Sequence, residues 1–227
     1  GTSAAASAAT ANAYVIKSGV FEPLTGANGA GGNDELEGIK LANKLYPTIL
    51  GKKVELVVVD NKSDKVEAAN AAMVLAQKEK VNAVLGSWGS SLSMAGGPIF
   101  AEAKIPAVAV SATNPNVTKG NEHYFRVCFL DPFQGTVGAA YAYNTLKAKK
   151  VAIIREVSND YSVGLTKFFV DNFVKLTGDD KAVVATADYN TGDQDFSAQL
   201  TNIKQHNPDV IFAPGNYTES ALIIKQA

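Results

Sequence analysis

Short apolar runs alternate with longer amphipathic stretches along most of this chain. A first apolar run ends near Phe21, and others lie at residues 54–60, 82–85 and 107–110. The run VELVVVD, at 54–60, is continuous and β-branched, which is typical of a strand buried on both faces of a parallel sheet. Helical spacing follows in ELEGIKLANKLY and KVEAANAAMVLAQKEK. This alternation predicts parallel βαβ units and an α/β fold.

The alternation pauses at YFRVCFLDPF, residues 124–133, and then restarts with three apolar runs, at residues 151–155, 182–187 and 210–213. We therefore predict two similar lobes, an N-terminal lobe at 14–125 and a second lobe at 126–227. Three strands are fewer than the roughly four to six of a typical sheet. Because the sequence stops at Ala227 inside a helical pattern, we expect the second lobe to be partial and the chain to be truncated.

Two segments rich in small residues are predicted to be irregular. Residues 1–13 are small and uncharged, without apolar periodicity, and are expected to form a disordered leader. They lack the basic start and apolar centre of an intact signal peptide. The segment GANGAGGN, at 26–33, is too rich in glycine for a regular element. The first helix is therefore expected to begin beyond it, with Asn33 or Asp34 as the cap.

Hydroxyl-rich turns follow two neighbouring strands of the first lobe. The run at 82–85 leads into GSWGSS, and the run at 107–110 leads into SATNP. Ligands of open α/β sheets bind at the carboxyl ends of the strands, so these turns predict half of a small-molecule site. Ser90 and Thr113 offer hydroxyl groups, and the N–H groups of the helix that starts there favour an anionic group such as a carboxylate.

Tyrosines follow two strand ends in the second lobe. Tyr161 lies in VSNDYSVG, and Tyr217 lies in APGNYTES. A tyrosine offers an apolar wall with a polar tip, which suits a ligand held between two lobes. We therefore expect both tyrosines to face the hydroxyl-rich turns of the first lobe.

Composition excludes several functional classes. The chain is 46% apolar and 19% charged, with a net charge of −1, so it has no electrostatic footprint for nucleic acid. Its single cysteine, Cys128, cannot form an intramolecular disulfide and is expected to be a buried thiol. No apolar run approaches the ~18 residues of a transmembrane helix.

Motifs for catalysis, metals and cofactors are absent from the sequence. The residues around Ser90 read WGSSL and form no Gly-x-Ser-x-Gly elbow. His123 and His206 lie in polar contexts without partners, and metal-ligand spacings are missing. The glycines at 26–32 lack both the dinucleotide spacing and the Walker lysine. Aspartates near helix starts, such as Asp131 and Asp160, are explained as caps. We therefore predict no catalytic residue, no metal and no cofactor.

The order and spacing of longer motifs carry a resemblance that covers residues 14–227. These motifs are PLTG followed by ELEGIKLA, VELVVVDNKSD, VLGSWGSS followed by IPAVAVSATNP, YFRV, NDYSVGL, and FSAQLTNIKQHNPDVIFAPGNY. The chain resembles the leucine/isoleucine/valine-binding proteins, which are solute-binding components of ABC importers with the type I periplasmic-binding fold. The resemblance implies two Rossmann-like lobes with parallel sheets, joined by a hinge and closing over one amino acid.

The resemblance also implies a role for each candidate site residue. Ser90 would bind the ligand carboxylate, helped by the backbone N–H groups of its turn and by Thr113. The carbonyl of Ser111 and the hydroxyl of Thr113 would bind the ammonium. Trp88 would line the side-chain pocket, and the two tyrosines would close it. A further acidic partner of the ammonium is expected beyond the end of this sequence. The predicted ligand-binding residues are Trp88, Gly89, Ser90, Ser111, Ala112, Thr113, Tyr161 and Tyr217.

The function implied by the resemblance is capture of an amino acid, branched-chain or otherwise aliphatic, for delivery to a membrane ABC permease. Such a protein would act outside the cytoplasm, in the periplasm or as a cell-surface lipoprotein. Two alternatives stay open: a same-fold binder of an amide, urea or small carboxylate, and the ligand-binding domain of a sensory receptor. Unfinished sheet edges also predict self-association.

Overall fold

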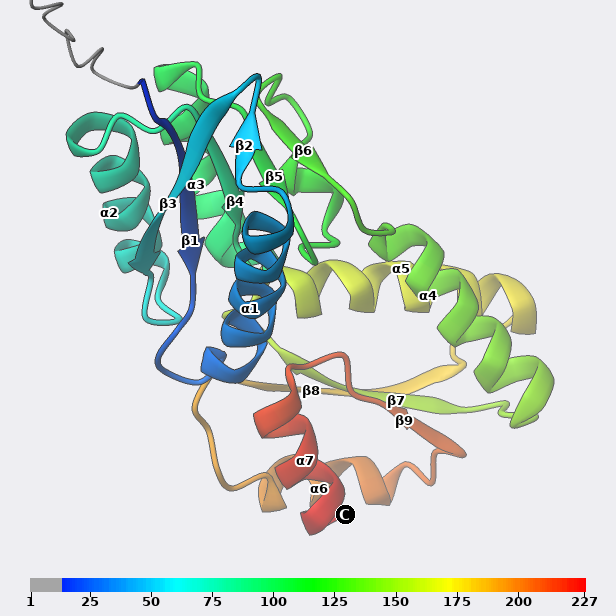
Figure 1. Ribbon diagram of the computed structural model, residues 1–227. Helices are drawn as coiled ribbons and strands as arrows, with labels where there is room; N and C mark the ends of the chain where they lie inside the picture. The colour runs from blue at the N-terminus through cyan, green and yellow to red at the C-terminus, as the bar shows by residue number, and fades with distance from the viewer. Residues whose placement is uncertain (1–13) are drawn as a thin grey trace, which may run out of the picture.

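The computed structural model describes residues 14–227, and it places them in two lobes that each contain one sheet (Figure 1). The leader predicted at 1–13 lies outside the described residues. The first sheet holds six strands, β1 (Ile16–Glu22), β2 (Thr48–Ile49), β3 (Lys52–Asp60), β4 (Ala83–Gly86), β5 (Ala107–Ala109) and β6 (Tyr124–Arg126). The second holds β7 (Val151–Glu156), β8 (Val183–Tyr189) and β9 (Val210–Phe212).

All strand pairs are parallel except the short pair of β2 with β3. The order is β2-β3-β1-β4-β5-β6 in the first sheet and β8-β7-β9 in the second. The predicted α/β class with parallel sheets is therefore confirmed. In each sheet the first parallel strand lies between its two successors, which creates a switch point where ligands of open α/β sheets bind. Glu22 ends β1 at one switch point, and Glu156 ends β7 at the other.

Helices cover both faces of the first sheet (Figure 1). They are α1 (Gly29–Leu45), α2 (Lys65–Met73), which continues as the π-helical turn η1 (Val74–Lys78), and α3 (Ser90–Ala103). The core on one face joins Phe21 and Val84 of the sheet to α2 and to Phe100 of α3. The core on the other face packs Leu36 and Ile39 of α1 against Val20. A 3-10 turn, η2 (Pro115–Val117), follows β5.

The second lobe has the same layered arrangement. Its helices are α4 (Asp131–Ala140), which continues as η3 (Tyr141–Thr145), α5 (Asp160–Thr177), α6 (Ser197–Gln205) and α7 (Tyr217–Gln226). Ile153 packs towards α4 and α5 on one face, and Ile154 packs towards α6 and α7 on the other, as successive side chains of a strand do. The first sheet ends at Arg126 and α4 packs against α5, while the exact boundary at 125/126 stays a prediction.

The prediction of an irregular segment at 26–33 holds for 26–28 and was wrong for 29–33, because α1 begins at Gly29. The residue before it, Asn28, forms no side-chain cap, and neither Asn33 nor Asp34 starts the helix. The glycines serve close packing here. A Cβ on Gly31 would lie 2.5 Å from Trp88 Nε1, and a Cβ on Gly32 would lie 2.1 Å from the carbonyl oxygen of Pro23. Their absent side chains let the start of α1 lie against both neighbours.

The prediction that β3 is buried on both faces was also wrong. Val54 is buried, but Val58 is 40% exposed. β3 is the second strand from the edge, and only the two-residue β2 lies outside it. A continuous apolar run is therefore compatible with a partly exposed strand near an edge. Within residues 14–227, no helix is both long and apolar enough to cross a membrane.

Candidate functional site

A cavity of about 340 Å³ lies between the two lobes, within the range of small-molecule sites. Seven of the eight predicted site residues line it, and their part in ligand binding stays a prediction. The exception is Ala112, whose side chain is buried in the first-lobe core and whose carbonyl accepts a hydrogen bond from Arg126. The complete lining is Trp88, Gly89, Ser90, Ser111, Thr113, Phe129, Gln134, Tyr161, Gly215, Asn216 and Tyr217.

The first-lobe wall is built around the start of α3. Its N-cap, Gly89, has a φ of 88° and supplies no side-chain cap. The N–H groups of a first helical turn have no partner within the helix, so this end attracts an anion. Ser90 is buried, and its Oγ accepts a hydrogen bond from the backbone N–H of Asn114 at 3.1 Å. A serine hydroxyl also has one proton to donate, and this proton is available to a ligand oxygen.

The turn after β5 completes this wall. The Ser111 hydroxyl donates to Glu35 on α1, and the Thr113 carbonyl accepts the backbone N–H of Asp131 at 3.0 Å. These contacts tie the turn to α1 on one side and to the start of α4 on the other. The predicted hydroxyl-rich turn after β5 is thus held by partners from two elements, α1 and α4.

Aromatic side chains from both lobes form the remaining walls. Trp88 of the first lobe and Tyr217 of the second lie edge to face, with ring centroids 5.9 Å apart and planes inclined by 63°. The Tyr217 hydroxyl accepts the backbone N–H of Gly31 at 3.3 Å. The Tyr161 hydroxyl accepts a hydrogen bond from Gln134 Nε2 at 2.9 Å. The hydroxyl group of each tyrosine is therefore held in place by a hydrogen bond.

Sequence reasoning missed four of the lining residues. Gly215 and Asn216 precede Tyr217 in the motif that pointed to the tyrosine, so the position after β9 was a usable signal. Phe129 and Gln134 lie where the chain passes between the lobes, and no periodicity or motif distinguishes them. Their place on the cavity depends on how α4 packs against α5.

The cavity has polar groups but no charged side chain among the described residues that line it. Hydroxyls, amides and aromatic rings surround it, together with the N-termini of α3 and α7. A ligand with several like charges would be buried there without counterions, at a high cost. A neutral or zwitterionic solute fits this lining. Within residues 14–227, no group of three or more His, Cys, Asp or Glu side chains could hold a metal ion.

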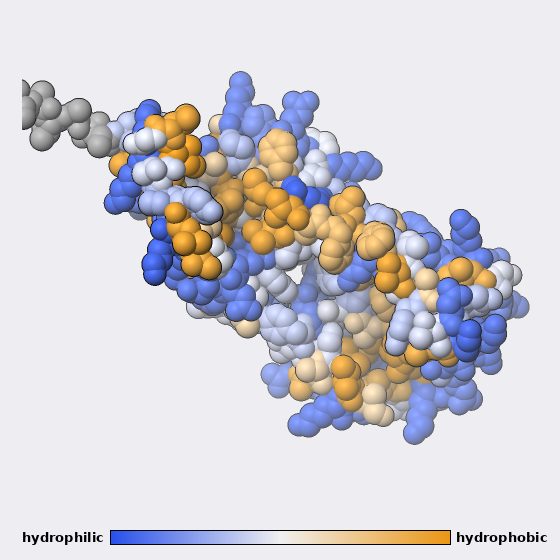
Figure 2. All heavy atoms as spheres, turned by 45° about the vertical axis from the view of Figure 1, so that its right-hand side comes forward, coloured by the Kyte–Doolittle hydropathy of each residue, from blue (hydrophilic) through white to orange (hydrophobic). Residues whose placement is uncertain are grey.

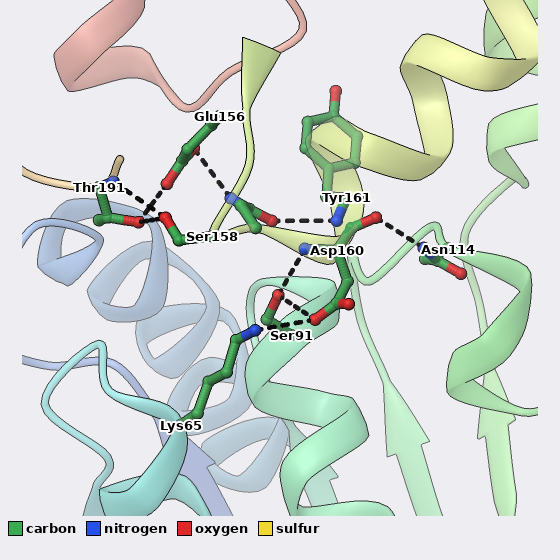
Figure 3. Close-up of polar contacts among 9 residues, drawn as sticks. Lys65, Ser91, Asn114, Glu156, Ser158, Asp160, Tyr161 and Thr191 are labelled. Carbon is green, nitrogen blue, oxygen red and sulfur yellow. Dashed lines mark hydrogen bonds and ion pairs between the residues drawn. The ribbon is translucent and has the colours of Figure 1, made fainter. Parts of the chain in front are cut away.

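Direct hydrogen bonds join the lobes beside the cavity (Figure 3). Asp160, at the start of α5, accepts from Lys65 Nζ at 3.1 Å and from Ser91 Oγ at 2.7 Å. Its backbone N–H donates to Ser91 Oγ, and its carbonyl accepts from Asn114 Nδ2. The helix cap of α5 is instead Asn159. The explanation of Asp160 as a cap was therefore wrong, because its side chain contacts the other lobe.

Three carboxyl groups are buried behind the first-lobe wall. Burial and the neighbouring Glu35 raise the pKa of Glu22 to about 10, and burial also raises the pKa of Glu35. Burial raises the pKa of Asp131, with the Arg126 charge acting in the opposite direction. Both carboxyl oxygens of Asp131 are buried without a hydrogen-bond partner among the described residues, so its explanation as a cap was wrong. Sequence reasoning did not single out either glutamate.

Comparison with known proteins agrees with this architecture. Residues 15–227 match the family described as periplasmic binding protein. The chain belongs to the periplasmic binding protein family. The family predicted from the motifs is therefore confirmed over nearly the whole chain.

This periplasmic binding protein is similar in structure to two solved binding proteins. The leucine-binding protein LivK of Thermotoga maritima is 46% identical, with a TM-score of 0.89, over 94% of this chain and 60% of LivK. The branched-chain amino acid transporter substrate-binding protein LivJ of Streptococcus pneumoniae, in complex with isoleucine, is 34% identical, with a TM-score of 0.85, over 94% of this chain and 61% of LivJ.

A curated relative that is similar in sequence is also a binding protein. An amino acid binding protein of Pseudomonas aeruginosa is 32% identical over 212 residues, which are 92% of this chain and 56% of the relative. The periplasmic binding protein described here therefore spans little more than half the length of that relative. These relatives are binding proteins and not enzymes, as the motif analysis predicted for this chain.

Proposed function

We propose that this chain captures a free amino acid with an aliphatic, branched side chain between its two lobes. The observation that carries the proposal is the cavity lining, which combines the Ser90 hydroxyl and a helix N-terminus with aromatic walls and, within residues 14–227, has no charged side chain. An amino acid is a zwitterion with an apolar tail, so it needs one anion-binding end and one apolar wall. The names of LivK and LivJ point to the same class of ligand.

In this proposal each wall has one task. Ser90 and the N-terminus of α3 bind the ligand carboxylate, because both direct N–H or O–H donors at the cavity. The carbonyl of Ser111 and the hydroxyl of Thr113 bind the ammonium. Trp88 and the tyrosines enclose the side chain, and the polar contacts between the lobes hold the closed form.

The proposal extends to the full-length protein. It acts outside the cytoplasm, in the periplasm or as a lipoprotein at the cell surface, and it presents the closed lobes to the membrane permease of an ABC importer. Membership of the periplasmic binding protein family supports this assignment, as does the similarity to LivJ, a transporter substrate-binding protein.

Calorimetry with matched ligands tests the proposal. L-Leucine, L-isoleucine and L-valine are expected to bind, while leucinamide and 4-methylpentanoate, which lack the carboxylate and the ammonium respectively, are expected to bind at least about tenfold more weakly. Equal affinity for 4-methylpentanoate and leucine would identify a small-carboxylate binder. Binding of acetamide or urea in preference to leucine would identify the amide alternative.

A serine variant links the affinity to the site. Ser90→Ala is expected to weaken leucine binding by about ten- to a hundredfold, since a hydrogen bond to a charged group contributes roughly 1.5–3 kcal/mol. Thr201→Ala, which removes an exposed hydroxyl from α6, is the control and is expected to leave the affinity unchanged. Unchanged affinity in Ser90→Ala would contradict the assigned carboxylate site.

A further inference from the structure

Two glutamates, Glu22, which is buried, and Glu35, which is half-buried, lie directly behind the cavity wall. Glu22 ends β1 and is fully buried, and its Oε2 accepts the backbone N–H of Trp88 at 2.6 Å. Glu35 lies on α1, and its Oε1 accepts the hydroxyl of Ser111. Each carboxyl group therefore holds one residue that lines the cavity. Neither glutamate lines the cavity itself.

The backbone around Glu22 is adapted to its carboxyl group. Gly86 ends β4 with a φ of 111°, and a Cβ at this position would lie 2.4 Å from Glu22 Oε1 and 2.5 Å from the carbonyl oxygen of Phe21. Any larger residue would push the carboxyl group away from the turn that carries Trp88. The close fit indicates that the position of this group matters for the turn.

In each of the two carboxyl groups, one oxygen has a hydrogen-bond partner and the other has none among the described residues. Glu22 Oε1 and Glu35 Oε2 are both buried without a hydrogen-bond partner among the described residues. The two carboxyl groups also lie close enough for the charge of Glu35 to raise the pKa of Glu22. Two ionised carboxylates in contact repel each other and cannot hydrogen-bond, because an ionised carboxylate only accepts. One proton between them removes the repulsion and supplies the missing donor.

The surroundings provide no other source of compensation. The ionisable groups that interact with the pair are the phenol of Tyr124 and the thiol of Cys128, and the pKa of each is raised by burial, which keeps it neutral. Arg126 is directed to the carbonyls of Ala112 and Asn114. Asp60, which pairs with Glu22 across the sheet, accepts instead from the loop at 24–25. Among the described residues, no lysine or arginine forms an ion pair with Glu22 or Glu35.

We propose that Glu22 and Glu35 share one proton, and that this proton positions the Trp88 backbone and the Ser111 hydroxyl at the cavity wall. Loss of the proton leaves two buried negative charges in contact, which separate and release the two residues they hold. The glutamates are positioning residues, and ligand affinity falls when the pair becomes doubly ionised. This last consequence rests on the proposed function, whereas the shared proton does not.

Carboxyl NMR on the ligand-free chain tests the shared proton directly. With 13C-labelled glutamate side chains, one carboxyl is expected to titrate above pH 7, several units above ordinary glutamates. The backbone amide of Trp88 is expected to shift with the same midpoint. Absence of any glutamate carboxyl titrating above pH 7 would overturn the shared proton, and a Trp88 amide that does not follow the titration would overturn its positioning role.

Matched variants assign the titration. Glu22→Gln imitates the protonated acid, because its carbonyl can accept from Trp88 and its amide can donate to Glu35, so the high titration is expected to disappear while the fold is retained. Glu35→Gln makes the reciprocal change and serves if Glu22→Gln does not fold. Glu37→Gln, on the exposed face of the same helix, is the control and is expected to keep the high titration. Persistence of that titration in Glu22→Gln would overturn the assignment. In Glu35→Gln, burial still raises the pKa of Glu22, so there the contrary result is a midpoint unchanged from that of the unmodified chain.

Leucine affinity connects the proton to binding. Because the ligand ammonium also titrates at high pH, the useful quantity is the ratio of the Kd of the unmodified chain to the Kd of Glu22→Gln. This ratio is expected to rise at least about threefold between pH 7 and pH 9.5 as the pair ionises. A constant ratio would overturn the effect on affinity. Absence of leucine binding at every pH, with the carboxyl and Trp88 titrations present, would contradict the proposed function and leave the positioning proton supported.

Discussion

Ser91 and Asp160 bond to each other twice across the two lobes. Ser91 Oγ donates to Asp160 Oδ2 at 2.7 Å and accepts the backbone N–H of Asp160 at 2.8 Å. The two residues lie at the starts of α3 and α5, so the contact holds two helix N-termini against each other beside the cavity (Figure 3). The arrangement links the relative position of the two lobes to the residues that line the cavity.

Removal of the Asp160 carboxylate is expected to weaken closure. Asp160→Ala loses the hydrogen bond from Ser91, which as a charged hydrogen bond contributes about 1.5–3 kcal/mol, so leucine affinity is expected to fall at least about tenfold. Lys65→Ala is expected to have a smaller effect, because an exposed ion pair contributes only about 0.2–1 kcal/mol. Calorimetry measures the leucine affinity, and small-angle X-ray scattering measures the change in the radius of gyration when leucine is added.

The control for this experiment lies on the same helix. Asp171→Ala removes an exposed aspartate that pairs with Lys167, and both affinity and radius are expected to stay unchanged. Equal affinities for Asp160→Ala and Asp171→Ala would show that the contact between helix starts does not contribute to closure.

A methyl group at Gly31 is expected to disturb the aromatic wall. Gly31→Ala places a Cβ 2.5 Å from Trp88 Nε1, so the indole must move away from Tyr217. Trp88 is the single tryptophan of the chain, and its fluorescence reports the change directly. We expect a shifted emission maximum and weaker leucine binding. Gly38→Ala lies on the same helix, with open space around its Cβ. It is expected to leave the emission maximum and the leucine affinity unchanged and to stabilise the fold by up to about 1 kcal/mol.

Asp131 is expected to make stability depend on pH. Burial raises its pKa above the ordinary value of 3.8, so the folded chain keeps a proton that the unfolded chain releases. Its stabilising contribution is therefore complete below pH 3.8 and is lost as the pH rises through the folded pKa. Asp131→Asn cannot ionise, so the Tm of the variant relative to the unmodified chain is expected to rise between pH 4 and pH 8. Asp34→Asn, which is exposed on α1, should give a constant difference. A constant difference for Asp131→Asn would contradict the argument.

Open strand edges are expected to cause association of copies. In the described residues β6, β8 and β9 each pair on one side only, and such edges pair readily with another chain. Figure 2 shows apolar side chains extending from the first lobe to the second, and Phe125 of β6 is 53% exposed. Light scattering should give a mass that increases with concentration. Phe125→Lys is expected to reduce this increase, while Val66→Lys, on α2, should leave it unchanged. A monomeric mass at all concentrations would refute the expectation.

Much of the fold follows from local patterns in the sequence. The apolar runs that end near Phe21 and at Leu85 became β1 and β4, because a buried strand needs a continuous apolar segment whatever surrounds it. The hydroxyl-rich turns followed from their place after those strands, and seven predicted residues line one cavity. The signal was strong because strand position and residue type point to the same edge of the sheet.

The sequence predictions failed where two interpretations of a local pattern were equally reasonable and only tertiary contacts decided between them. A glycine-rich run is normally flexible, and only its close packing against Trp88 and Pro23 shows why α1 begins inside it. An aspartate at a helix start is normally a cap, and only the opposite lobe shows that Asp160 is a contact between lobes. Glu22 and Glu35 come together because α1 packs over the end of β1, which no local pattern encodes.

The cores of the two lobes are separate. Every buried apolar cluster of the described residues belongs wholly to residues before 125 or wholly to residues after 138. The contacts between the lobes include hydrogen bonds such as that from Asn216 to Asn28, the ion pair of Lys65 with Asp160, and the edge-to-face contact of the Trp88 and Tyr217 rings. Water can replace each hydrogen bond between the lobes as they separate, and no buried apolar cluster has to be divided. The lobes can therefore separate without partial unfolding of either core.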